Sequence, residues 1–220
     1  MSICILNQAN SVFNNFLAEA RDSSIQSDRL RFRLNMERMG EIIAYEISKT
    51  LPYKKKEIET PLGIAEESII NEYPVLFSIL RAGLPVHEGM LRLFDKADNA
   101  FITTYRHYEK DYPLSISVQD FTCPYIQKKT IIISDAMMAS GQSMVATYNA
   151  IIKHGPPSYV HIVSLVASKE GLNYLRKRIS SDNVSIWIGT LDDELTVKSF
   201  IVPGLGDAGD LAFGAKIDSH

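Results

Sequence analysis

Residues Thr130 to Ser143 read TIIISDAMMASGQS. The apolar, β-branched start of this segment predicts a buried strand over residues 130–134, which ends at the carboxylate of Asp135. The small residues at 139–143 predict a loop, and a helix is expected over residues 143–153. Such a helix start offers unpaired N–H groups and a partial positive charge, so the segment can hold a phosphorylated sugar. An ordinary strand–helix turn would show the same pattern.

Short apolar runs and helical patterns alternate on both sides of this segment. This alternation predicts an α/β fold, with a parallel, Rossmann-like sheet covered by helices on both faces. Ligands of such sheets bind outside the carboxyl ends of the strands, which brings together the loop after Leu80, the strand end at Tyr105-Arg106 and the Asp135 loop. The expected strands are 75–80, 101–105, 159–166 and 184–188, with an extended segment at 115–121 and further helices at 85–94 and 169–179.

The first 70 residues have a different pattern. Helices are expected over residues 11–21 and 28–49, the second with Ser27 as its N-cap. From Tyr53 to Gly63, alternating charged and apolar residues predict a small hairpin or β-arm. No linker divides the chain, so we expect one domain over residues 1–220. Its parts are the N-terminal helices and β-arm (1–70), the core (71–190) and a C-terminal loop region (191–220).

Composition excludes several classes of function. The chain has 220 residues and a formal net charge of −3, which disfavours binding to nucleic acid because that binding depends on basic surface. No apolar run is long enough to span a membrane, and the first residues lack the pattern of a signal peptide. The two cysteines match neither a metal motif nor a disulfide framework. We therefore expect a soluble, cytoplasmic protein that does not bind membranes.

Two arginines follow predicted strands at the edge where the ligand is expected. Arg81 begins the sequence RAGL, and its planar guanidinium suits phosphate oxygens. Arg106 would place a second cation at the same edge, which suits a second anionic group such as a diphosphate. The charged and aromatic loop that starts at His107 is in a position to close over a substrate. For Arg81 the alternative is a surface ion pair at the edge of the sheet, and for the segment after Arg106 it is an exposed loop with no role.

The segment from Ile201 to Asp210 reads IVPGLGDAGD, with three glycines, two aspartates and little helical or strand pattern. Glycines let backbone amides and carbonyls approach a flat ligand closely, so this segment can read the edge of a small planar base. A turn-rich loop without a ligand is the alternative. The five histidines do not fall at metal-ligand spacings, so no metal site built by the protein is predicted.

Four of these segments together resemble the uracil phosphoribosyltransferase family. They are LRAGL at 80–84, YR at 105–106, SDAMMASGQS at 134–143 and PGLGDAGD at 203–210, and they occur in the order and at about the spacing of that family. The resemblance extends from about Arg21 to Lys216. It implies the type I phosphoribosyltransferase fold, in which residues 191–220 form a uracil-binding hood.

The resemblance implies the reaction of uracil with 5-phosphoribosyl-1-diphosphate (PRPP) to give UMP and diphosphate, as in pyrimidine salvage. Mg²⁺ would arrive with the diphosphate, as it usually does with phosphate substrates. The implied catalytic residues are Arg106, Asp135 and Asp207. The implied PRPP-binding residues are Arg81, Arg106, Asp135, Ala136, Met137, Met138, Ala139, Ser140, Gly141, Gln142, Ser143 and Asp207. The implied uracil-binding residues are Ile201, Gly206, Asp207 and Ala208.

The phosphate loop departs from the family pattern D-P-M-L-A-T-G-G-S at four positions, which are Ala136, Met138, Ser140 and Gln142. Two alternative functions stay open, and the departures at Ser140 and Gln142 motivate the first of them. One is a non-catalytic regulator that binds PRPP or a nucleotide, and the other is a phosphoribosyltransferase for another base, against which the PGLGDAGD segment argues. The resemblance also implies a homodimer or higher homo-oligomer, and it leaves activation by GTP open.

Overall fold

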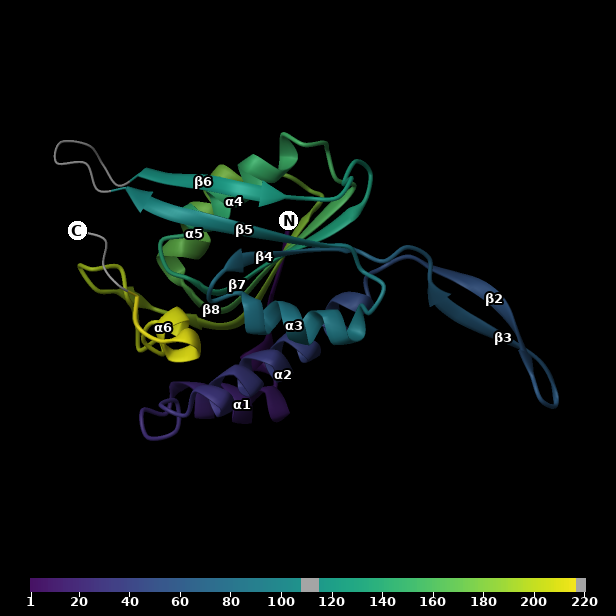
Figure 1. Cartoon of the computed structure of the whole chain (residues 1–220), viewed down its shortest axis with the longest axis horizontal. Helices are drawn as coiled ribbons and strands as arrows, with labels where there is room; N and C mark the ends of the chain where they lie inside the picture. The colour runs from purple at the N-terminus through teal and green to yellow at the C-terminus, as the bar shows by residue number, and fades with distance from the viewer. Residues whose placement is uncertain (108–114, 217–220) are drawn as a thin grey trace.

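A seven-stranded sheet forms the centre of the protein (Figure 1). The computed structural model of the chain describes residues 1–107 and 115–216. The strand order is β1-β9-β8-β7-β4-β5-β6, and neighbouring strands are parallel except for the last pair. The strands are β1 (Ser2–Ile5), β4 (Val75–Leu80), β5 (Asn99–His107), β6 (Ser115–Thr122), β7 (Thr130–Met138), β8 (Tyr159–Ser168) and β9 (Val184–Asp192).

The predicted parallel sheet is confirmed, with three corrections. Strand β6 runs antiparallel to β5 and closes one edge of the sheet. Strand β1, which was not predicted, pairs with β9 at the other edge and is largely exposed, so it lacks the apolar pattern of a buried strand. Strand β7 continues to Met138, so Asp135 lies inside the strand instead of at its end.

Helices cover both faces of the sheet. Successive strand residues point to opposite faces, so a strand that is apolar throughout has apolar side chains to bury on each face. On β7, Ile132 packs on one face with α1 (Val12–Arg21), α2 (Arg29–Ser48) and α3 (Leu84–Leu93). Its neighbours Ile131 and Ile133 pack on the other face with α4 (Gln142–Ile152) and α5 (Lys169–Arg178). The two faces therefore have separate apolar cores, as a parallel sheet buried on both sides requires.

The long N-terminal helix α2 packs closely on α3. A Cβ atom at Gly89 would lie 2.0 Å from the Glu37 carbonyl oxygen, and one at Gly40 would lie 2.4 Å from the Val86 carbonyl oxygen. The predicted N-cap of α2 is wrong by one residue, because the Asp28 carboxylate accepts the hydrogen bond from the Arg31 N–H at 3.0 Å. Asp competes well with Ser for this role, since its ionised side chain also suits the positive helix end.

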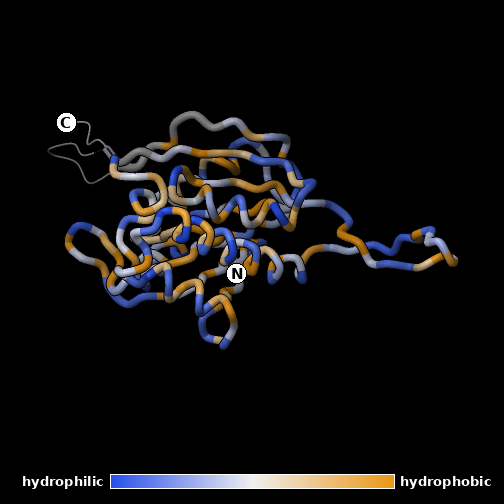
Figure 2. Tube along the Cα trace, turned by 60° about the horizontal axis from the view of Figure 1, so that its bottom comes forward, coloured by the Kyte–Doolittle hydropathy of each residue, from blue (hydrophilic) through white to orange (hydrophobic). Residues whose placement is uncertain are grey.

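The predicted β-arm is present and is longer than expected. Strands β2 (Tyr53–Thr60) and β3 (Gly63–Ile70) pair antiparallel over their full lengths. The arm projects away from the body in both views and carries polar and apolar segments along its length (Figures 1 and 2). None of the helices in the described ranges is long and apolar enough to cross a membrane.

His161 of β8 is buried and forms hydrogen bonds with neutral side chains. The Trp187 indole N–H donates to its Nδ1 at 3.1 Å, and the Ser185 hydroxyl oxygen lies 3.2 Å from the same atom. Because Nδ1 accepts the Trp187 hydrogen bond, the neutral ring carries its proton on Nε2. Burial lowers the pKa of His161 from 6.5 to about 4, since a charged imidazolium would lose its hydration.

We expect this histidine to make the protein less stable in mild acid. The unfolded chain binds the proton first as the pH falls, so the stabilisation is complete above pH 6.5 and is lost as the pH falls towards 4. The loss corresponds to about 3 kcal/mol of unfolding free energy. Urea unfolding followed by fluorescence of Trp187, the only tryptophan, measures it. A His161→Gln variant keeps an acceptor for Trp187 and should show a flatter pH profile, and an equally steep one would contradict the assignment.

Candidate active site

The carboxyl edge of the sheet gathers three segments that are far apart in sequence. The loop after β4 carries Arg81, and the loop after β7 leads into α4. The predicted hood covers residues 191–220, of which residues 193–216 follow β9 in the described part and are called the hood from here on. In Figure 1 the hood helix α6 (Ala208–Phe213) lies beyond the carboxyl ends of β7 and β8. Strands β4, β5 and β7 are parallel, so the prediction that the loop after Leu80, the strand end at Tyr105-Arg106 and the Asp135 loop share one edge is confirmed. The hood, which that prediction did not include, lies at the same edge.

The predicted phosphate loop, residues 139–143, leads into the N-terminus of α4. Gly141 is the N-cap of α4 and has a left-handed backbone with φ of +75°, which favours glycine. Helix α4 begins at Gln142, one residue earlier than predicted, and the Val145 N–H donates to the Gly141 carbonyl at 3.0 Å. The N–H groups of the first helical turn are directed towards the loop, so the site favours an anion.

The start of α5 packs against this loop and is hydrogen-bonded to it. The Ser168 hydroxyl donates to the Ala139 carbonyl at 2.6 Å and accepts from the Gly171 N–H at 2.8 Å. A Cβ atom at Gly171 would lie 2.3 Å from the Ala139 carbonyl oxygen, and one at Gly141 would lie 2.5 Å from the Gly171 carbonyl oxygen. The phosphate loop and α5 therefore touch backbone to backbone, and Gly171 belongs to the site although the sequence analysis did not single it out.

Asp135 is half-buried on β7 and lies opposite Ser164 of β8 in the parallel register. On its other side β7 pairs with β4, which leads into the RAGL loop. There, a Cβ atom at Gly83 would lie 2.8 Å from the carbonyl oxygen of Ser134. This close approach holds the start of α3 against β7 next to Asp135.

Arg81 links the RAGL loop to the hood. Its Nη2 atom lies 3.2 Å from Asp210 Oδ1 and 3.4 Å from the Gly214 carbonyl oxygen. The guanidinium side chain is 41% exposed, so water screens this ion pair and the interaction is weak. Arg81 is thus placed beside the hood and keeps enough exposure to exchange its protein partner for an anionic ligand.

The hood is more regular than the sequence indicated. It contains a short hairpin of β10 (Glu194–Leu195) and β11 (Ile201–Val202), followed by α6. Asp207 is the N-cap of α6, and its Oδ1 accepts from the Asp210 N–H at 3.0 Å. The prediction of little helical or strand pattern here is wrong, because a two-residue strand and a six-residue helix are too short to give a periodic signal.

The four residues that the resemblance assigns to uracil lie within this one segment. Ile201 and Ala208 are buried, Asp207 is half-buried, and Gly206 is exposed with φ of +91°. The positive φ fits glycine and lets the backbone turn between β11 and α6.

For Arg106 the structure describes the backbone and not the side chain. This residue lies near the end of β5 and pairs in register with Ile116 of β6, and its side chain lies outside the described part of the structure. The predicted closing loop from His107 falls mostly on residues 108–114, which are also outside it. The expected extended segment at 115–121 is confirmed as β6.

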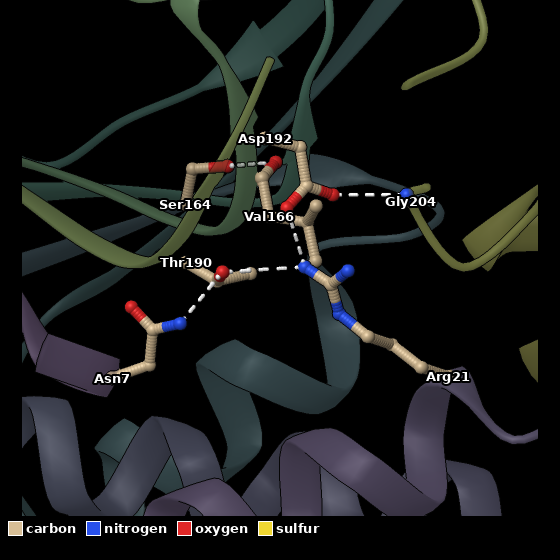
Figure 3. A network of polar contacts seen from close by, with 7 residues as sticks. All are labelled: Asn7, Arg21, Ser164, Val166, Thr190, Asp192 and Gly204. Atoms are coloured by element: carbon tan, nitrogen blue, oxygen red, sulfur yellow. Dashed lines mark hydrogen bonds and ion pairs between the residues drawn. The ribbon is translucent and has the colours of Figure 1, made fainter. Parts of the chain in front are cut away.

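A polar network under the hood was missed by the sequence analysis (Figure 3). Asp192, the last residue of β9, accepts hydrogen bonds from the Arg21 guanidinium at 2.7 Å and the Gly204 N–H at 2.9 Å. Asp192 is 6% exposed. An acidic residue soon after a buried apolar run drew attention to Asp135, and the same signal was available at Asp192.

Among residues 1–107 and 115–216, no group of three or more His, Cys, Asp and Glu side chains could hold a metal ion. Two hollows, of about 310 and 260 Å³, lie at the opposite edge of the sheet. Pro157 and Asn183 line the first, and Thr130 and Tyr159 line the second, all near the amino ends of β7, β8 and β9. Both hollows are therefore separate from the phosphate loop and the hood.

Comparisons with known proteins agree with this arrangement. The family model for uracil phosphoribosyltransferase matches residues 8–215. A protein of Porphyromonas gingivalis named uracil phosphoribosyltransferase is 46% identical over 217 residues, which cover 99% of this chain and 100% of that protein. One of the same name from Methanothermobacter thermautotrophicus is 33% identical, over 94% of this chain and 96% of that protein.

The solved structure of the AQ2163 protein from Aquifex aeolicus has a TM-score of 0.85 and 28% identity to this chain, and covers 98% of this chain and 99% of its own. Nearly the whole chain thus matches the family in sequence, and its fold matches a solved structure over the same length. This chain belongs to the uracil phosphoribosyltransferase family.

Proposed function

We propose that this protein is a uracil phosphoribosyltransferase, which converts uracil and PRPP to UMP and diphosphate in pyrimidine salvage. The observation that carries the proposal is the Arg81–Asp210 contact, which joins the RAGL loop to the hood at the carboxyl edge of the sheet. The phosphate loop opens onto the same edge. One site can therefore hold a phosphoribosyl donor and a planar base side by side.

The residue roles that we propose are those that the resemblance implies, and the chemistry of the side chains and backbone supports them. The backbone at 139–143 and the first turn of α4 hold the ribose 5-phosphate, because unpaired N–H groups and the helix dipole favour a phosphate. Asp135 accepts hydrogen bonds from the ribose hydroxyls. Arg81 and Arg106 bind the diphosphate. Backbone groups of Ile201, Gly206 and Ala208 bind uracil, and Asp207 lies beside both substrates. The resemblance also assigns Ala136, Met137 and Met138 to PRPP. The side chains of Ala136 and Met138 are buried in the core, so we propose that these two residues contribute backbone groups only.

In the reaction, the bond between the anomeric carbon of ribose and the diphosphate oxygen breaks, and a bond to the uracil ring nitrogen forms as that nitrogen loses its proton. Positive charge develops on the ribose and negative charge on the leaving diphosphate. The two arginines oppose the second charge, so they stabilise the transition state more than the ground state. The hood fixes the uracil ring nitrogen near the anomeric carbon, which supplies the remaining acceleration.

We propose Mg²⁺ as the cofactor, and it neutralises charge on the diphosphate when bound. It usually binds through one or two carboxylates together with substrate phosphates, and Asp207 is suited to this. Asp207 Oδ1 accepts from the Asp210 N–H, and its Oδ2 lies 3.9 Å from Lys216 Nζ, so the carboxylate has a fixed orientation. We further propose a homodimer or higher homo-oligomer, activation by GTP, a cytoplasmic location and a single domain over residues 1–220 with residues 191–220 as the hood.

The test is to incubate the purified protein with uracil, PRPP and Mg²⁺ and to follow UMP by chromatography. We expect UMP with uracil, and none with hypoxanthine or orotate. Omission of Mg²⁺ tests the proposed cofactor, and addition of GTP tests the proposed activator. Product from another base would favour a different base specificity, and calorimetric PRPP binding without any product would favour the regulator.

Gln142 allows a test of the unusual phosphate loop. The helix start is already formed with this residue, which is half-buried at the first position of α4. We therefore expect Gln142→Gly to change kcat/KM by less than about threefold. Its unfolding free energy should fall by about 0.5–1 kcal/mol, because glycine is a poorer helix former. A tenfold rise in kcat/KM would instead mean that the glutamine side chain obstructs the phosphate.

A further inference from the structure

We infer that Asp192 is a positioning residue for uracil. It fixes the hood through the Gly204 backbone, and Arg21 holds it in place. This inference rests on the proposed function, because it concerns the part of the hood to which we assign uracil. Asp192 itself lies outside that set and at the end of a core strand (Figure 3).

The Asp192 carboxylate is buried and fully hydrogen-bonded. Asp192 is 6% exposed, and a buried carboxylate is costly unless it is paired and hydrogen-bonded. Both of its oxygens have partners: Oδ1 accepts from Arg21 Nη2 at 2.7 Å, and Oδ2 accepts from the Gly204 N–H at 2.9 Å. The carboxylate therefore forms a bridge between the end of α1 and the hood.

Arg21 is held in position by its helix and by β9. It is the last residue of α1, where a cation suits the negative end of the helix. Its Nη2 also donates to the Thr190 hydroxyl at 3.2 Å, and that hydroxyl accepts from the Asn7 side-chain amide at 2.9 Å. Thr190 and Asp192 lie two residues apart on β9, so the guanidinium is held along the strand, which limits the positions that Asp192 can adopt.

Gly204 lies in the tight turn that follows β11 in the hood. Its φ is +57°, and a Cβ atom there would lie 2.2 Å from the Ile201 carbonyl oxygen. Gly204 thus lies directly against Ile201 and two residues before Gly206, both of which we assign to uracil. The next residue, Leu205, is buried in the core. A shift of the Gly204 N–H would therefore move the backbone groups that face the base.

The far end of the hood is fixed independently of Asp192. Asp207 caps α6, and the Arg33 guanidinium donates to the Ala212 carbonyl at 2.7 Å. Loss of Asp192 should therefore release the turn at 201–206 while α6 stays in place. The expected consequence is a selective defect in uracil binding, since the phosphate loop has its own support from α5.

The experiment compares Asp192→Ala, Asp192→Asn and the control Asp193→Asn. Asp193 is the neighbouring carboxylate, but it is 70% exposed and pairs with Lys169 at 2.5 Å. We expect Asp192→Ala to raise the KM for uracil by about ten- to a hundredfold, as for loss of a hydrogen bond to a charged group, with the KM for PRPP nearly unchanged. Asp192→Asn should show a smaller rise, because its amide oxygen can still accept from Gly204. The control should behave like the wild type.

Amide hydrogen exchange of the peptide covering residues 201–211 supplies a readout that does not need activity. We expect faster exchange in Asp192→Ala and a wild-type rate in Asp193→Asn. Unchanged exchange in both Asp192 variants, an unchanged KM for uracil, or equal rises of both KM values would overturn the inference. Absence of UMP formation by the wild type would instead count against the proposed function, and the exchange rates would still report whether Asp192 holds the hood.

Discussion

Gly171→Ala is expected to lower turnover by about a hundredfold, although Gly171 does not belong to the phosphate loop. The new Cβ atom would lie 2.3 Å from the Ala139 carbonyl oxygen and 2.8 Å from that of Met138. Both contacts are with backbone, which cannot rotate away as a flexible side chain can. The loop between β7 and α4 must therefore shift, and a displacement of about 1 Å at a reacting group can reduce the rate by this amount.

The kinetic pattern distinguishes this effect from general damage. The KM for PRPP should rise and kcat should fall. The KM for uracil should change little, because the turn at 201–206 is held by the Asp192–Gly204 hydrogen bond, and α5 meets the hood through the exposed Lys169–Asp193 pair. Overpacking should also lower the unfolding free energy by about 1–3 kcal/mol, so thermal unfolding must be measured alongside. Asn173→Ala is the matched control on the exposed side of the same helix. Wild-type kinetics in Gly171→Ala would show that the loop does not need this close contact.

Much of the fold could be predicted because its signals are local. The apolar run at 130–134 and the small residues after it gave β7, the phosphate loop and α4, each to within a few residues. Strand β4 begins and ends at the predicted residues. Such segments are long or apolar enough for their periodicity to be read from neighbours in the sequence.

The features that were missed depend on partners far away in the chain. Asp192 is bound by Arg21 and Gly204, and Gly171 is needed because Ala139 lies against it. No periodic pattern marks such pairs, since each is created only when separate loops meet at the carboxyl edge of the sheet. The edge strand β1 was missed for a different reason: it is largely exposed, and an exposed strand does not need an apolar pattern.

Arg81→Ala is expected to lower kcat by about a hundredfold, as for loss of a donor that stabilises charge in a transition state. We propose that the guanidinium turns from Asp210 to the leaving diphosphate. Its 3.2 Å ion pair with Asp210 is exposed and weak, whereas a diphosphate carries more charge and offers two oxygens to the planar fork. The measurement is kcat for UMP formation with both substrates saturating.

Asp210→Asn separates the two roles that Arg81 could have, because it weakens the ion pair and leaves the cation in place. If Arg81 acts on the diphosphate, Asp210→Asn should retain kcat within about threefold while Arg81→Ala loses far more. If Arg81 only fastens the hood, both variants should lose activity together, with a raised KM for uracil. Arg81→Lys refines the distinction, since lysine keeps the charge without the planar fork and should recover only part of the loss.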